Sequence, residues 1–313
     1  MGRWVAVLGS SMKPDEYPSI EDGNEGICPL CDLSVGEGEV TVIKGEPILT
    51  EAGELGRKGA GIYDRMNPVG VYEIVIESAG HAATPEETGP GKGGAGVHFK
   101  RVFETYIKRL AVLSEDPRIR YVFIYKNKGK ASGARVSHPH SEILATPVIP
   151  EAIKQELEGA KAYFSYKERC IFCDILHEEE RAEKRLIAAT EHFLAFSPFA
   201  PRVPFEFWVV PKRHSCDFGD ISPTELDGLS SLLPELLQKM KSALNDPPYA
   251  YYIHTAPNRV PRRNHWHTLG DDYHWHMEVL PKLSQGPRAI DWGSGFFILT
   301  TSPEDAAKYL KEA

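Results

Sequence analysis

Long apolar runs and a surplus of positive charge are both missing from this sequence of 313 residues. No run is long enough to cross a bilayer, and the N-terminus lacks the basic-then-apolar pattern of a signal peptide. The net charge of −8 argues against a general nucleic-acid-binding protein, which needs a basic surface to neutralise phosphates. We therefore expect a cytoplasmic protein that binds neither membranes nor nucleic acids.

Cysteine is also scarce. The sequence has five cysteines, an odd number that fits a secreted disulfide framework poorly. Four of them form two Cys-x-x-Cys pairs, Cys28 with Cys31 and Cys170 with Cys173. In a reducing compartment such pairs are usually metal ligands or redox motifs.

Predicted strands and helices alternate along the chain. The capping box Ser222-Pro223-Thr224-Glu225 opens a long amphipathic helix that continues to about residue 244. Several connections are too short for helical crossovers, so we predict an α+β fold with mostly antiparallel sheets and flanking helices. Strands are expected at 71–77, 121–125, 143–149, 193–196, 206–210, 249–253 and 277–280, and further helices at 99–113, 151–168 and from residue 302.

The same order of metal-binding residue types occurs twice. Each half has a Cys-x-x-Cys pair, then a histidine just after a strand, then the first histidine of a His-x-His run. We interpret this as a duplicated domain, with an N-terminal repeat at 1–160 and a C-terminal repeat at 161–313. The two sets are Cys28, Cys31, His81 and His138, and Cys170, Cys173, His214 and His274.

A Cys₂His₂ set provides the four ligands that a structural zinc ion needs, so we predict two zinc ions, one in each repeat. A redox function for the cysteine pairs is the alternative, although two pairs in matching positions argue against it. His214 lies in a basic run that could be a surface turn, and His192 is the alternative fourth ligand.

The run His138-Pro139-His140-Ser141-Glu142 is the predicted catalytic segment. Alternation along a strand would place His138, His140 and Glu142 on one face. His138 could then bind zinc while His140 stays free, and a neutral imidazole is a competent nucleophile toward an activated phosphorus. The alternative is that both histidines are metal ligands or core residues.

Donors for phosphate oxygens precede this run in the sequence. Asn127 belongs to Tyr125–Gly129, and Gly133, Ala134 and Arg135 follow it closely. Their side chains and backbone N–H groups could contact a phosphorylated substrate.

The stretch from Tyr121 to His140 closely resembles galactose-1-phosphate uridylyltransferases, a branch of the histidine-triad superfamily. Its shared pattern is Asn127-Lys-Gly129, Gly133-Ala134 and His138-Pro139-His140. The resemblance extends to Tyr63-Asp64-Arg65-Met66-Asn67, His81 and Trp292-Gly293-x-Gly295.

The resemblance implies ping-pong transfer through a covalent nucleotidyl-histidine. His140 would attack the α-phosphorus of UDP-glucose, release glucose 1-phosphate, and pass the uridylyl group to a hexose 1-phosphate. It also implies that Asn127 contacts phosphate, that Tyr63, Asp64 and Asn67 bind substrate, and that the protein is a homodimer. In some members Glu156, His254, His274 and His276 match a different second metal site.

Three positions depart from the family pattern. Glu142 replaces a glutamine, Arg135 replaces a serine, and Phe296-Phe297 replace a hexose-binding Tyr-Glu pair. A carboxylate at position 142 would repel phosphate unless it were protonated or paired. Two alternatives therefore stay open: a phosphorylase or hydrolase acting on an ADP-sugar or dinucleoside polyphosphate, and a catalytically silent, zinc-containing nucleotide-binding protein.

Overall fold

The protein is described by a computed structural model. It covers residues 28–31, 33, 36, 39–45, 49–81, 94–259, 267–283 and 294–313. Within these residues, no helix combines the length and the apolar character needed to span a bilayer.

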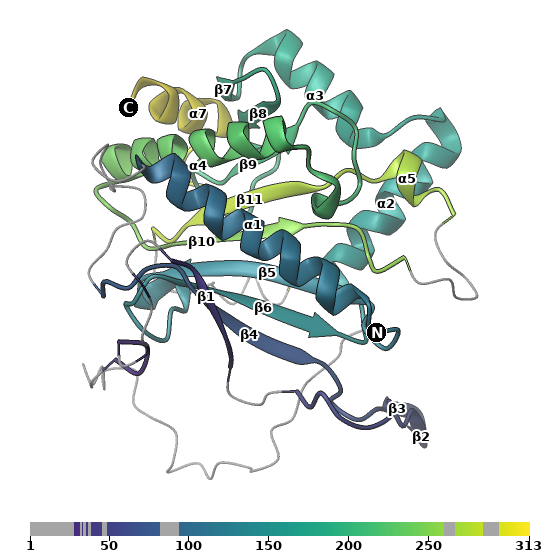
Figure 1. Ribbon diagram of the computed structural model, residues 1–313. Helices are drawn as coiled ribbons and strands as arrows, with labels where there is room; N and C mark the ends of the chain where they lie inside the picture. Colours follow the sequence, from purple (N-terminus) through teal and green to yellow (C-terminus); the bar gives the residue numbers. More distant parts are fainter. Residues whose placement is uncertain are drawn as a thin grey trace.

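One nine-stranded antiparallel sheet forms the centre of the molecule (Figure 1). Its strand order is β1-β4-β6-β5-β10-β11-β9-β8-β7, and β2 pairs with β3 in a separate hairpin. The strands are β1 (Thr41–Lys44), β2 (Lys58–Ala60), β3 (Tyr63–Arg65), β4 (Val71–Ile76), β5 (Tyr121–Lys128), β6 (His140–Thr146), β7 (Leu186–Ala189), β8 (Phe193–Phe196), β9 (Phe207–Pro211), β10 (Tyr249–His254) and β11 (His276–Pro281).

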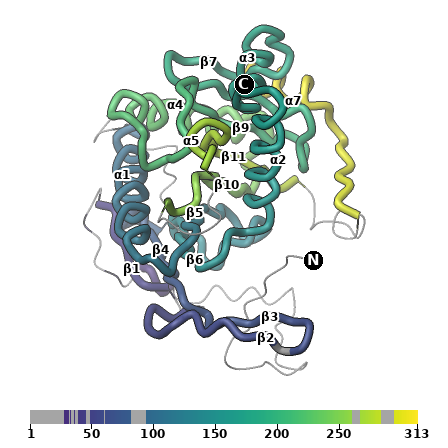
Figure 2. The backbone as a smooth tube through the Cα atoms, turned by 90° about the vertical axis from the view of Figure 1, so that its right-hand side faces the viewer, coloured from purple at the N-terminus to yellow at the C-terminus, as the bar shows by residue number. Residues whose placement is uncertain are grey.

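Helices pack on both sides of this sheet. Figures 1 and 2 show α1 and α4 on one side and α2 on the other. The main apolar core lies between the sheet and the pair α1 and α4. The helices are α1 (Gly94–Ser114), α2 (Glu151–Lys167), α3 (Ile171–Ala182), α4 (Pro223–Leu244), α5 (Leu269–Asp272) and α7 (Pro303–Glu312), with short 3₁₀ turns η3 (Lys130–Ser132) and η4 (Phe218–Asp220).

The predicted capping box begins α4. The Ser222 hydroxyl accepts from the Glu225 N–H, and the Glu225 carboxylate accepts from the Ser222 N–H. Pro223 occupies the first turn, where its missing N–H has no cost. Leu229, Leu233 and further apolar residues at helical spacing then face the core.

The sheet has a symmetric order about the pairing of β5 with β10. β6 lies next to β5 as β11 lies next to β10, and β4 and β9 come next on either side. The predicted α+β class with antiparallel strands and flanking helices is confirmed. The division at residue 160 stays a prediction.

The start of β6 differs from the prediction. A strand that includes His138, His140 and Glu142 is predicted, but β6 begins at His140, and it pairs with β4 from His140 opposite Ile76 to Ala145 opposite Val71. His140 and Glu142 are therefore fixed within the sheet, two residues apart on one face.

Candidate functional site

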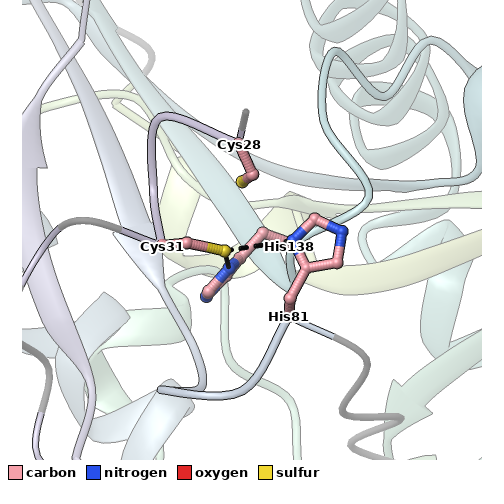
Figure 3. A group of neighbouring side chains, drawn as sticks. All are labelled: Cys28, Cys31, His81 and His138. Atoms are coloured by element: carbon pink, nitrogen blue, oxygen red, sulfur yellow. Dashed lines mark hydrogen bonds between the residues drawn. The ribbon is translucent and has the colours of Figure 1, made fainter. Parts of the chain in front are cut away.

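The N-terminal repeat brings its four predicted zinc ligands together (Figure 3). Cys28 and Cys31 come from a tight turn before β1, His81 follows β4, and His138 is separated from the start of β6 by Pro139. The Cys31 Sγ lies 3.2 Å from the His81 Nδ1 and 3.5 Å from the His138 Nδ1. Residues far apart in the sequence thus meet at the end of β4 and the start of β6, close in sequence to His140.

This arrangement fits a tetrahedral zinc ion. Zinc–sulfur bonds of ~2.3 Å and zinc–nitrogen bonds of ~2.0 Å place tetrahedral ligand atoms about 3.5 Å apart. The ligand atoms of the group all lie within 4.8 Å of one another. The His138 Nε2 lies 2.7 Å from the Ser78 carbonyl oxygen, which accepts its proton and leaves Nδ1 free for the metal.

The C-terminal repeat forms a matching group of Cys170, Cys173, His214 and His274. The Cys173 Sγ lies 3.3 Å from the His214 Nδ1 and 3.7 Å from the His274 Nδ1. The His214 Nε2 lies 2.9 Å from the Gly270 carbonyl oxygen, so its Nδ1 also faces the cysteines. Among the described residues, His214 and not His192 belongs to this group.

A third group of Glu156, His254, His276 and Glu278 lies nearby. It contains three of the residues that match the alternative second metal site, but His274 has joined the cysteines instead. The His254 Nδ1 lies 3.0 Å from the Glu156 carboxylate, and Arg202 forms an ion pair with Glu278. The His276 Nε2 faces the Glu278 carboxylate at 3.4 Å.

His140 lies at the start of β6, almost fully buried. Its Nδ1 lies 2.7 Å from the backbone oxygen of His138. A carbonyl oxygen only accepts, so Nδ1 carries a proton. In the neutral ring the lone pair then lies on Nε2, which is the tautomer that a nucleophile needs.

The connection from β5 to β6 contains the predicted phosphate donors. Gly133 has a φ of 102°, a left-handed conformation that favours glycine, and a side chain there would approach the Asn127 amide. The N–H groups of Gly133 and Ala134 donate to the carbonyls of Lys130 and Gly129. The side chains of Asn127 and Arg135 are thus better placed to be donors than the loop backbone.

Glu142 is buried on the same face of β6 as His140. Its carboxylate accepts from the hydroxyls of Tyr72 on β4 and Tyr125 on β5, the latter at 2.8 Å. Burial, and then the interaction with Glu142, raises the pKa of each tyrosine, so both stay neutral donors. The charge of Arg135 acts on both tyrosines in the opposite direction. Glu142 is therefore a paired carboxylate.

Sequence reasoning did not find Tyr72. Its position in β4 could have indicated it. Ile76 lies opposite His140 and Ile74 lies opposite Glu142. Because side chains alternate along a strand, Tyr72 is the next residue of β4 on the same face. The pairing register was needed to use that signal.

The other predicted substrate residues lie on the β2–β3 hairpin or just after it. Tyr63 and Asp64 are exposed on the β2–β3 hairpin, which projects from the main sheet (Figure 1). In the described part of the chain, no hydrogen bond joins either of them to His140. The exposed Asn67 donates to the Glu54 carbonyl at 2.8 Å. Trp292 and Gly293 lie outside the described residues.

Both halves of the chain match models of one known protein family. Residues 55–150 match the galactose-1-phosphate uridyl transferase N-terminal domain, and residues 156–305 match the C-terminal domain. The chain belongs to the galactose-1-phosphate uridyl transferase family. A relative of the family, galactose-1-phosphate uridylyltransferase from Thermotoga maritima, is 27% identical over 326 residues, which cover 99% of this chain and 95% of the relative.

A second relative has a different activity. ADP-glucose phosphorylase from Arabidopsis thaliana is 34% identical over 243 residues, which cover 78% of this chain and 64% of the relative's own length. The crystal structure of an ADP-glucose phosphorylase from Arabidopsis thaliana with bound ADP-glucose has a TM-score of 0.76 at 31% identity. That match covers 88% of this chain and 82% of the solved chain.

Proposed function

We propose that this protein is a UDP-glucose–hexose-1-phosphate uridylyltransferase that works through a covalent bond to the Nε2 atom of His140. Its substrates would be a nucleotide sugar and a sugar 1-phosphate. The observation that carries the proposal is the 2.7 Å contact between the His140 Nδ1 and the His138 carbonyl, which directs the lone pair of the neutral ring to Nε2.

Transfer would take place in two displacements. In the first, the Nε2 lone pair forms a bond to the α-phosphorus, the bond from that phosphorus to the bridging oxygen breaks, and the sugar 1-phosphate leaves with the electron pair. In the second, an oxygen of the acceptor phosphate attacks the same phosphorus, and the electron pair of the P–N bond returns to Nε2. The two displacements together regenerate neutral His140.

Asn127 and Arg135 are the groups we assign to the phosphate oxygens. Asn127 follows Tyr125 by two residues on β5 and so lies on the face of His140 and Glu142. The charge of Arg135 reaches the Tyr72–Glu142–Tyr125 cluster. Glu142, with hydroxyl donors from two strands, would have its negative charge directed away from the substrate.

The two Cys₂His₂ groups are assigned to structural zinc ions. A zinc ion bound there would close four ligands into a rigid tetrahedron and would offer no open position for substrate. In the N-terminal group this fixes His138, and the backbone oxygen of His138 in turn fixes the ring of His140.

A phosphorylase acting on an ADP-sugar is the second candidate. It is favoured by the 34% identity to ADP-glucose phosphorylase, against 27% to the uridylyltransferase from Thermotoga maritima. Inorganic phosphate would then replace the sugar 1-phosphate as acceptor, while His140 would perform the same first displacement.

The test is to incubate the purified protein with UDP-glucose or ADP-glucose without acceptor and to measure its intact mass. A uridylyl adduct supports the transferase, and an adenylyl adduct supports the phosphorylase. The adduct should be absent from His140→Gln and should disappear when the acceptor is added. Binding of nucleotide sugar without any adduct would instead indicate a catalytically silent protein.

A homodimer in the cytoplasm completes the proposal. The exposed large apolar side chains include Ile62 (91%) on the β2–β3 hairpin and Phe296 (72%) near the C-terminus. Burial between two subunits would remove them from water. The mass of the protein in solution, measured by light scattering, tests the subunit number.

A further inference from the structure

A set of polar side chains is buried in the core directly behind His140. The core on this side of the sheet is mostly apolar, with Ile124 and Ile143 fully buried. Polar residues that are buried so deeply must be satisfied by one another. The set comprises Glu77, Tyr106, Lys126, Ser141 and Tyr251, of which Lys126 is 3% exposed and the others 1% or less.

An ion pair forms the base of this set. The Lys126 ammonium contacts the Glu77 carboxylate, and the Tyr106 hydroxyl lies 3.4 Å from the other oxygen of Glu77. The same hydroxyl lies 2.7 Å from the Ser141 Oγ and 2.9 Å from the Tyr251 hydroxyl. Burial opposes ionisation of Glu77, but the charge and hydrogen bond of Lys126 outweigh it and lower its pKa.

The set contacts both neighbours of His140 in the sequence. The Glu77 N–H donates to the Pro139 carbonyl at 3.0 Å, and the side chain of Ser141 is joined to Glu77 through Tyr106. Lys126 is in turn the residue that precedes Asn127 on β5. The buried set therefore contacts the backbone before His140 and the side chain after it. Through Lys126 it is also connected to the backbone of Asn127, the proposed phosphate donor.

Stability alone does not account for this arrangement. A buried ion pair is often no more stabilising than apolar side chains of similar volume, because both charges lose their hydration. The chain offers a comparison in the nearly buried pair of Arg185 and Glu179, which joins α3 to the segment before β7. Only the pair of Lys126 and Glu77 adjoins the segment of His140.

We propose that Lys126 and Glu77, acting through Tyr106 and Ser141, are positioning residues that hold the Nε2 atom of His140 in line with the α-phosphorus. This inference rests on the proposed nucleotidyl transfer. In-line attack demands a fixed ring, and a displacement of 1 Å can slow a reaction about 100-fold.

The decisive variants are Tyr106→Phe and Ser141→Ala, which remove one hydroxyl each and keep the ion pair. Single-turnover formation of the nucleotidyl adduct should slow about tenfold or more in each, with the half-saturating nucleotide-sugar concentration unchanged. Lys126→Met should slow it further. The matched control Arg185→Met should lower the melting temperature but leave the rate within about twofold of wild type.

A second readout does not depend on turnover. In protein with ¹⁵N-labelled histidine, the ring signals of His140, identified by their loss in His140→Gln, should report the Nδ1–H tautomer in the wild type. They should shift toward a mixture of tautomers in Tyr106→Phe and Ser141→Ala.

Rates within about twofold of wild type in both hydroxyl variants, with unchanged His140 signals, would overturn the positioning role. A rise in half-saturating concentration without a fall in rate would also overturn it. If the wild type forms no adduct, the proposed function fails, and the tautomer signals still decide whether the buried set holds the ring.

Discussion

The Nδ1 atom of His140 lies 2.7 Å from the backbone oxygen of His138. His138 itself is held by its own ring, with Nδ1 toward the cysteine pair and Nε2 on the Ser78 carbonyl. One short segment therefore joins a metal group to the proposed nucleophile. Loss of the metal should therefore change the orientation of the His140 ring more than it changes the rest of the sheet.

The two metal groups should differ in their effect on chemistry. Cys31→Ser should remove one zinc ion and slow adduct formation by about 10- to 100-fold, because the support of the nucleophile is lost. Cys173→Ser removes the equivalent ligand of the other repeat, and it should lower stability with a much smaller change in rate. Zinc content by mass spectrometry and single-turnover rates check both. Equal rate losses in the two variants would contradict the link through His138.

The fourth ligand of the C-terminal group can be tested by zinc counting. His214→Ala should reduce the zinc content from two ions to one per chain, because its Nδ1 lies 3.3 Å from the Cys173 sulfur. His192→Ala is the matched control and should retain both ions. Retention of two ions by His214→Ala would exclude this ligand assignment.

The pairing of Glu142 predicts a rescue experiment. Tyr125→Phe removes a hydrogen bond to a carboxylate, an interaction worth about 1.5–3 kcal/mol, and should raise the KM for nucleotide sugar about tenfold. Adding Glu142→Gln removes the charge and should bring KM back to within about threefold of wild type.

Tyr252→Phe serves as the control for this rescue, because Tyr252 faces Tyr125 across the β5–β10 pairing and interacts with Glu278 instead. Steady-state kinetics of the four proteins give the comparison. A double variant as impaired as Tyr125→Phe alone would show that the hydroxyl has another function.

Acid should weaken the start of α4 through Glu225. Arg213 and the Ser222 cap together outweigh burial and lower the pKa of this carboxyl from 4.5 to about 2. A lowered folded-state pKa adds stability above the unfolded value, and that stability is lost as the pH falls from about 4.5 toward 2. Because the Arg213 side chain is half exposed, solvent screening reduces the contribution to about 1 kcal/mol.

Urea unfolding of wild type and Glu225→Gln at pH 6 and pH 3 measures this contribution. The difference between the two proteins should be largest at pH 6 and should shrink at pH 3. A difference that grows on acidification would contradict the sign of the pKa shift.

The metal groups could be predicted because their signal is local and occurs twice. Each Cys-x-x-Cys pair is a recognisable turn, and the repeat then supplied His81, His138, His214 and His274. The choice of His214 over His192 needed coordinates, because both histidines lie near β9 in the fold. Strands and helices with regular periodicity, such as β4 and α4, were predicted for the same local reason.

The features that were not predicted depend on contacts between segments that are distant in the sequence. The helix α3 was missed because it is short and strongly charged, with only Phe172, Leu176 and Glu179 buried. The buried pair of Lys126 and Glu77 was missed, although Lys126 alternates with core residues along β5 and Glu77 continues the alternation of β4 one residue past its end. A lone charge at such a position becomes interpretable only when its partner on another strand is known.

The central pairing of β5 with β10 also has a consequence during synthesis. The N-terminal half leaves the ribosome first, with β5 paired to β6 on one side and its other edge open until β10 emerges. An unpaired strand edge is a template for association with other chains. A chain truncated before Tyr249 should therefore aggregate, and chaperones that shield nascent chains should raise the yield of the full-length protein.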